Sequence, residues 1–277
     1  MTGAGGASLT RALRRRLGAP YSAGPDPQDA VRVCRAAAAR GLASTASYWD
    51  GPGDDPGSVA RAYVTLLDGL ADAALDAYLS VKGPALAFDQ ALFAQVAADA
   101  RERRLGVHLD VLGPETVEPA YSLLERADGG GLELGCTLPG RWRRSVDDAE
   151  RALALGLRVR VVKGEWPEAR AREVDPRTGF LDVVGRLAGR AVHVAVATHD
   201  VPLARAALDL LAAQRTPAEL EVLHGVPLER PLALARERRV PVRVYVSCGH
   251  RYAPYRLRDA VRRPVVLAWA ARDLVRG

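Results

Sequence analysis

Short apolar segments recur along this chain, and stretches rich in alanine, leucine and arginine with a helical period separate them. The apolar segments occupy positions 42–48, 77–82, 106–111, 132–138, 157–163, 192–198, 218–224 and 241–247. The hairpin signals typical of all-β proteins are missing, and parallel strands need long crossovers such as these. The pattern therefore predicts an α/β protein with strands and helices in alternation.

Eight such units are close to what a (β/α)8 TIM-type barrel needs, since that fold has about 250 residues. We predict a single-domain barrel over residues 41–277, preceded at 1–40 by a short N-terminal arm and a helix. That helix is expected over 29–40, closed by Gly41, with loops at 51–57 and 129–131. A doubly wound sheet is the competing architecture.

Charged side chains interrupt the apolar alternation on one face of several predicted strands. In RVRVV (158–162), Val159 and Val161 share one face while Arg160 lies on the other. Lys82, Asp110 and Tyr245 alternate with valine or leucine in the same way. If the apolar faces pack on the helices, these four side chains point into one cavity. Buried charges must then be neutralised by one another or by a bound ligand, and both alternatives stay open.

Composition excludes several function classes. The net charge of +6 comes from arginines interleaved with acids, as at 101–104 and 236–239, and no nucleic-acid motif accompanies it. No apolar run reaches the roughly 18 residues of a membrane span, and no secretory signal is evident. The three cysteines are scattered without metal-ligand spacing. We expect a cytoplasmic protein without a metal, with peripheral membrane association left open; the oligomeric state is not indicated.

Short motifs at the predicted strand ends resemble those of the flavin-dependent proline dehydrogenases, and they occur in that family's order. They are SVK at 80–82, LD at 109–110, RVVKG at 160–164, ATHD at 197–200, LHG at 223–225, VRVYV at 242–246 and HRYAPYRLR at 250–258. The resemblance spans about residues 42–265, which is nearly the whole predicted barrel. It implies a divergent member without the fused aldehyde-oxidising domain that some relatives carry.

What the resemblance implies is an enzyme that binds FAD, oxidises L-proline to 1-pyrroline-5-carboxylate or oxidises a related cyclic secondary amine, and passes electrons to a quinone or another acceptor. The implied catalytic residues are Lys82, Asp110, Arg160 and Tyr245. The implied cofactor-binding residues are Arg160, Val162, Lys163, Gly164, Trp166, Thr198 and His199. The implied substrate-binding residues are Lys82, Leu223, Tyr245, Arg258 and Asp259.

Several positions depart from the family's pattern. Asp259 follows Arg258 where the family has a second arginine, and Arg262 stands where it has an acid. The segment 137–145 lacks the family's glutamine, and Glu165 precedes Trp166 where a small residue is expected. These departures motivate two alternatives: a flavin enzyme for a different amine, or a non-catalytic barrel that has lost flavin binding.

Overall fold

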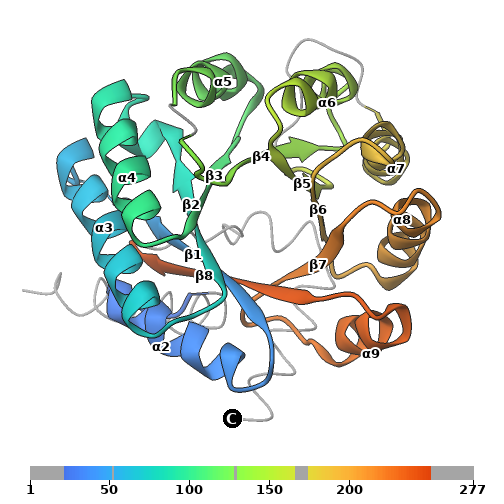
Figure 1. Ribbon diagram of the computed structural model, residues 1–277, viewed down its shortest axis with the longest axis horizontal. Coiled ribbons are helices and arrows are strands. Elements are labelled where there is room, and N and C mark those ends of the chain that lie inside the picture. Colours follow the sequence, from blue (N-terminus) through green and yellow to red (C-terminus); the bar gives the residue numbers. More distant parts are fainter. Residues whose placement is uncertain (1–21, 52, 128–129, 166–173, 251–277) are drawn as a thin grey trace, which may run out of the picture.

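The computed structural model describes residues 22–51, 53–127, 130–165 and 174–250. Its strands form one closed, all-parallel barrel in sequence order (Figure 1). They are β1 (Ala43–Trp49), β2 (Ala77–Lys82), β3 (Gly106–Asp110), β4 (Leu134–Pro139), β5 (Arg158–Val162), β6 (Val194–Ala197), β7 (Ala218–Leu223) and β8 (Val242–Gly249). The predicted (β/α)8 fold is thereby confirmed, and the doubly wound alternative was wrong.

A ring of α-helices surrounds the barrel (Figure 1). The helices are α2 (Pro27–Ala38), α3 (Pro56–Asp72), α4 (Gln90–Glu102), α5 (Val117–Arg126), α6 (Ser145–Ala154), α7 (Pro176–Leu187), α8 (Val201–Ala213) and α9 (Glu229–Arg238), with short 3-10 turns η2 (Gly83–Leu86) and η3 (Pro114–Thr116). Helices α3 to α9 each follow a strand. Helix α2 precedes β1 instead, and it packs on β1, β8 and α3.

Helix starts at the carboxyl ends of the strands carry strong local signals. Asp55, Asp89, Asp175 and Asp200 are N-caps whose carboxylates accept backbone N–H groups of the first turn. Proline at the first turn of α2, α3, α7 and α8 suits a position where no N–H is needed. The predicted loop at 51–57 is therefore shorter than expected, because Pro56 already belongs to α3.

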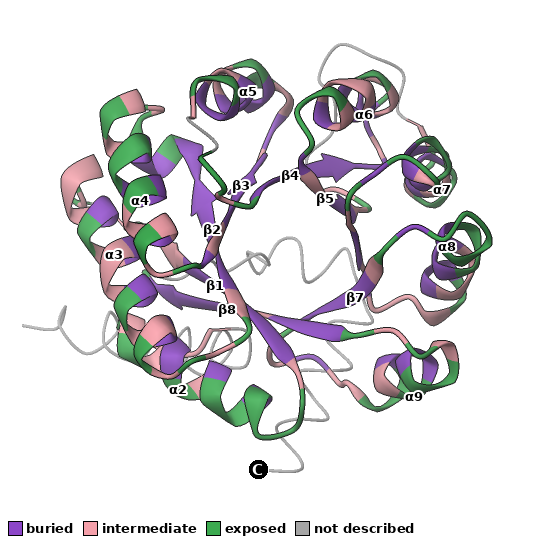
Figure 2. Cartoon of the chain, in the orientation of Figure 1, coloured by how far each residue is buried: buried purple, intermediate pink, exposed green. Residues whose placement is uncertain are grey.

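Most strand residues are buried (Figure 2), and the two faces of the sheet differ in chemistry. Outward residues such as Leu79, Val81, Leu109, Val159 and Val161 belong to the apolar core under the helices. The inward residues are largely polar, and their hydrogen bonds cross the barrel, as from Thr45 on β1 to Glu221 on β7. A barrel of this kind is usually filled by branched apolar residues. Here the apolar core lies between sheet and helices, and a polar core fills the barrel.

Candidate functional site

The upper cluster consists of Lys82, Asp110, Arg160, Glu221 and Tyr245, which come from five strands and meet inside the barrel. Lys82 and Asp110 are the last residues of β2 and β3 and are register partners. All except Tyr245 are buried, and Tyr245 is half-buried. The structure thus brings together the four side chains that the sequence pattern predicted to point into one cavity. Glu221 was not among them.

Asp110 is the common acceptor of the cluster. Its Oδ1 accepts from Arg160 Nη1 at 2.6 Å and from Thr137 Oγ1 at 3.3 Å. Its Oδ2 accepts from Tyr245 at 3.1 Å and from Lys82 Nζ at 3.4 Å. Burial alone would raise the pKa of Asp110, but Lys82 and Arg160 outweigh it and hold that pKa well below the usual range. Asp110 is therefore an anion throughout the physiological pH range.

Arg160 lies between two carboxylates. Its Nε donates to Glu221 at 2.9 Å, Nη1 donates to Asp110, and Nη2 donates to the Tyr78 hydroxyl at 3.3 Å. Burial opposes the charge of this side chain, but Glu221, Tyr78 and Asp110 keep the pKa of Arg160 well above its ordinary value. The guanidinium is thus always charged, and its acceptors on both sides fix its orientation.

Lys82 is enclosed by hydroxyl groups and aromatic rings. Its Nζ donates to Ser47 Oγ at 2.5 Å and to Tyr245 at 3.0 Å. The ammonium also lies 3.8 Å from the centre of the Trp49 ring, a favourable cation–π distance. Burial and Asp110 raise the pKa of Tyr245, so its phenol stays protonated and able to donate.

A neutral histidine supports the cluster from below. Burial, reinforced by Arg160, lowers the pKa of His108 well below its ordinary value. Thr137 Oγ1 donates to Asp110, so the 2.9 Å contact between that oxygen and His108 Nε2 requires the ring to donate. This relay, His108 to Thr137 to Asp110, fixes the tautomer with its proton on Nε2.

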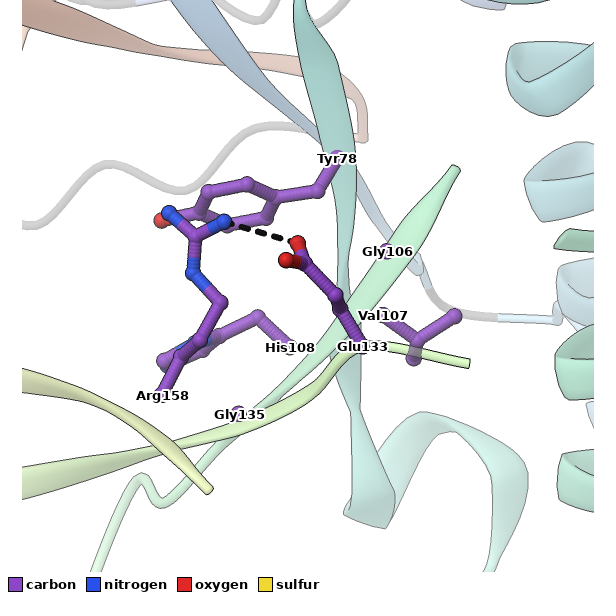
Figure 3. A pocket seen from close by; sticks show the side chains of 7 residues that line it. All are labelled: Tyr78, Gly106, Val107, His108, Glu133, Gly135 and Arg158. Atoms are coloured by element: carbon purple, nitrogen blue, oxygen red, sulfur yellow. Dashed lines mark hydrogen bonds and ion pairs between the residues drawn. The ribbon is translucent and has the colours of Figure 1, made fainter. Parts of the chain in front are cut away.

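A second group of charges, the lower cluster of Arg158, Glu219 and Arg243, lies toward the amino ends of the strands. Arg243 Nε donates to both oxygens of Glu219, at 2.9 and 3.0 Å. Arg158 reaches Glu219 at 3.3 Å and also pairs with Glu133 at the edge of the barrel. Figure 3 shows that pair beside a cavity of about 10 Å³, which has room for about one water molecule.

The carboxyl end of β5 forms one edge of the barrel mouth. Val162, at the end of β5, is half-buried, and Lys163 and Gly164 follow it. Gly164 has φ +87°, and a Cβ there would lie 2.8 Å from Pro139 Cβ, so glycine is required. Lys163, with 45% of its side chain exposed, has its Nζ 3.7 Å from Asp200, which also pairs with Arg177.

Thr198, His199 and Leu223 lie on the neighbouring edge. Thr198 is buried, and its hydroxyl accepts the N–H of Asp200. His199 Nε2 accepts the backbone N–H of Leu223 at 2.8 Å, and burial lowers the pKa of His199 to about 4. Leu223 is exposed and is the register partner of Tyr245. These predicted residues therefore gather at the mouth, above the upper cluster.

Three predicted residues, Trp166, Arg258 and Asp259, lie outside the described residues. Among those described, the site also includes residues that were not predicted from sequence: Thr45, Trp49, Tyr78 and Glu221. Glu221 carried a usable signal, because the segment AELEVL at 218–223 alternates acidic and apolar residues as the other strands alternate.

The mouth has features that fit a dinucleotide such as FAD. Lys163 is a partly exposed cation beside Gly164, whose backbone packs against the side chains of Pro139 and Arg141. His199 Nδ1 is a buried nitrogen that makes no hydrogen bond of good geometry, although the backbone of Pro227 lies close enough to act on the pKa of the ring. The described residues contain no group of three or more histidine, cysteine or acidic side chains that could hold a metal ion. Nor does that part of the chain contain a helix with the length and apolarity for a membrane span.

No family model matches the sequence, and no curated protein matches it significantly. Solved structures do match the fold. The barrel is similar to that of proline utilization A. The protein of that name from Bdellovibrio bacteriovorus, inactivated by N-propargylglycine, aligns with a TM-score of 0.74 and 16% identity over 87% of this chain and 32% of its own.

Two further structures of proline utilization A agree. The protein from Corynebacterium freiburgense gives a TM-score of 0.67 at 16% identity over 96% of this chain and 32% of its own. A structure with proline bound in remote sites gives 0.63 at 18% identity over 84% of this chain and 28% of its own. This chain thus spans about a third of those proteins, and identities this low establish a common fold alone.

Proposed function

We propose that this protein is an FAD-dependent dehydrogenase that oxidises the carbon–nitrogen bond of L-proline or a related cyclic secondary amine, and passes electrons to a quinone or another acceptor. The observation that carries the proposal is the meeting of Lys82, Asp110, Arg160 and Tyr245 in one polar cluster at the barrel mouth. The similarity of fold to proline utilization A is consistent with it.

The proposed roles follow from position and charge. FAD, when bound, accepts a hydride from the carbon beside the amine nitrogen. Lys163, Gly164, Thr198 and His199 would hold the cofactor at the mouth. The fixed cation Arg160 would stabilise negative charge that develops on its ring system.

Lys82, Asp110 and Tyr245 would bind and orient the amine. Because Tyr245 keeps its proton and Asp110 stays ionised, the site holds both a donor and an acceptor. The substrate must react as the free amine; Lys82 and Arg160 favour loss of its ammonium proton, whereas Asp110 and Glu221 oppose that loss. Leu223, exposed beside Tyr245, would wall the substrate pocket.

A second candidate, oxidation of an amine without a carboxylate, is favoured by one observation. The upper cluster has two cations, Lys82 and Arg160, and both are paired with its two carboxylates, Asp110 and Glu221. An anionic substrate therefore meets a charge-balanced site in the described part of the chain. If the substrate is proline, the residue implied to hold its carboxylate is Arg258, and Asp259 beside it would repel that carboxylate.

The test begins with the absorption spectrum of the purified protein, which should be that of oxidised flavin. Anaerobic addition of proline, and separately of pyrrolidine, should bleach it. Arg160→Met should slow bleaching by roughly 100-fold or more, the order seen when one charge-stabilising group is lost. Arg243→Met, a matched loss from the lower cluster, should leave the rate per folded molecule nearly unchanged.

Each outcome has a distinct meaning. Faster reduction by pyrrolidine than by proline would favour the second candidate over the first. A colourless protein that does not take up added FAD would contradict both. Full activity of Arg160→Met would contradict the position proposed for the cofactor.

A further inference from the structure

Glu221 is the least exposed member of the upper cluster after Lys82, with 2% of its surface accessible. It accepts hydrogen bonds from side chains on three other strands. These donors are Thr45 Oγ1 at 3.1 Å, Tyr78 OH at 3.2 Å and Arg160 Nε at 2.9 Å. Both carboxylate oxygens are used, so its position in the barrel is fixed.

The contact with Arg160 has an electrostatic consequence. Asp110 neutralises one edge of the guanidinium, but Asp110 is shared with Lys82. Glu221 pairs only with Arg160 among the cations of the upper cluster. Its charge therefore decides whether the cluster is neutral or carries a net charge of plus one. At a few ångströms' distance, a buried anion cancels much of the field that a cation would exert on a ligand.

We propose that Glu221 is a positioning residue that holds Arg160 in place and sets the positive charge that the barrel presents to the flavin. This inference rests on the proposed function, because it concerns the cofactor assigned there. The tendency of a flavin to accept electrons rises with nearby positive charge. Glu221 therefore restrains that tendency, and removing its charge while keeping its shape should increase it.

The decisive variant is Glu221→Gln, which removes the charge and retains an acceptor for Arg160 Nε. Sulfite, which adds to oxidised flavins to give an anionic product, is the probe. We expect its affinity to rise on the order of ten-fold, since one unit charge is removed from a buried site near the ligand. The midpoint potential should become more positive, by about 30 mV for each ten-fold change in the two-electron equilibrium.

Glu219→Gln is the matched control, because Glu219 lies on the same strand and the same face, two residues farther from the mouth, and pairs with Arg243. It should change sulfite affinity by less than about two-fold, because its distance from the mouth weakens the interaction. Glu221→Asp keeps the charge, so it should lie closer to wild type than Glu221→Gln does. If Glu221→Gln does not fold, Glu221→Met, uncharged and of similar volume, replaces it with the same expected shift.

The results separate this inference from the proposed function. A wild-type protein that binds FAD, with sulfite affinity and potential unchanged in Glu221→Gln, would overturn the inference and leave the proposed function intact. Equal shifts in the Glu219 and Glu221 variants would also overturn it, since the effect would then be general. A wild-type protein that binds no flavin would remove both.

Discussion

The two charged clusters inside the barrel are built from similar residues but are held differently. In the lower cluster, Arg243 makes two hydrogen bonds of 2.9 and 3.0 Å to one carboxylate, and the exposed acids Asp76 and Glu133 complete the pairing at the edge. In the upper cluster, Lys82 lies 3.4 Å from Asp110 and shares its other contacts with hydroxyl groups.

The Arg243–Glu219 pair of the lower cluster is rigidly held, whereas the Lys82–Asp110 pair of the upper cluster can change its geometry. The Arg243 guanidinium is held at every nitrogen, because Nε donates to both oxygens of Glu219, Nη1 to the backbone oxygen of Ser44 and Nη2 to Asp76, so it has little freedom to exchange partners. An ammonium that is surrounded by serine, tyrosine and one distant carboxylate can reorient toward an incoming group at small cost. We therefore propose that the amino end of the barrel is a support and the carboxyl end the place for binding, which is the usual arrangement in barrels of this fold.

Removal of one carboxylate from each cluster should produce the largest losses of stability. Asp110→Asn leaves Lys82 without its carboxylate, and Glu219→Gln leaves Arg243 without its buried one. An uncompensated buried cation typically costs about 3–5 kcal/mol of unfolding free energy. Urea denaturation would measure both losses. Only Asp110→Asn should also abolish amine oxidation per folded molecule. Equal retention of activity in both variants would show that the upper cluster is as structural as the lower one.

Acid should lower the stability of the folded protein through His108, which lies beneath the upper cluster. The pKa of His108 is lowered in the folded state, so below about pH 6.5 the unfolded chain binds a proton that the folded chain does not. As the pH decreases further, His108 alone should lower the free energy of unfolding by ~1.4 kcal/mol per pH unit.

Denaturation of wild type and His108→Gln at pH 7, 6 and 5 would check this, and the variant should show the shallower dependence. His193, beside Arg158 in the lower cluster and with its pKa lowered to about 4, acts in the same direction but is partly exposed. His193→Gln should therefore flatten the profile less. Asp110, with its pKa lowered in the folded state, stabilises the fold fully above about pH 4, and this stabilisation is lost only at lower pH, where the unfolded chain binds the proton first. A wild-type profile that is flat between pH 7 and 5 would contradict the neutral state of His108.

The smallest expected effect lies at the mouth, where Asp200 pairs with Lys163 and Arg177. Asp200→Asn keeps the helix cap, because asparagine caps as well as aspartate. Both cations have about half of their side chains exposed, so stability should change by less than about 1 kcal/mol. FAD affinity should rise roughly two- to five-fold at low salt, since a carboxylate no longer competes with the phosphates. Titration of apoprotein at two salt concentrations would measure this, and weaker binding would mean that Asp200 itself contacts the cofactor.

The pattern of apolar and polar residues was sufficient to predict the architecture. The predicted strands agree with the observed ones to within a few residues, because apolar alternation follows from burial against the helices. The same alternation correctly directed Lys82, Asp110, Arg160 and Tyr245 inward. The roles of all the predicted site residues stay predictions, including those of Trp166, Arg258 and Asp259, which lie outside the described residues.

The partners of Glu219 and Glu221 could not be predicted. Glu219 and Glu221 occupy a strand whose pattern also suits a solvated edge, and nothing local shows that each meets an arginine more than 20 positions away. The contact between Trp49 and Lys82 likewise depends on the register of strand pairing, because the parallel pairing of β1 with β2 brings these two residues to the same end. Such long-range partners are set by tertiary packing and leave little trace in a single sequence.

The position of α2 bears on how this protein folds. Helix α2 covers the seam where β1 meets β8, and the segment before it is tied to the last strand by bonds from Ala23 N to Ser247 O and from Gly249 N to Gly24 O. Closure therefore joins the beginning of the described chain to its end. Contacts of such large sequence separation form slowly. During synthesis, one edge of β1 stays unpaired until nearly the whole barrel has left the ribosome. Aggregation or chaperone binding is most to be expected during that interval.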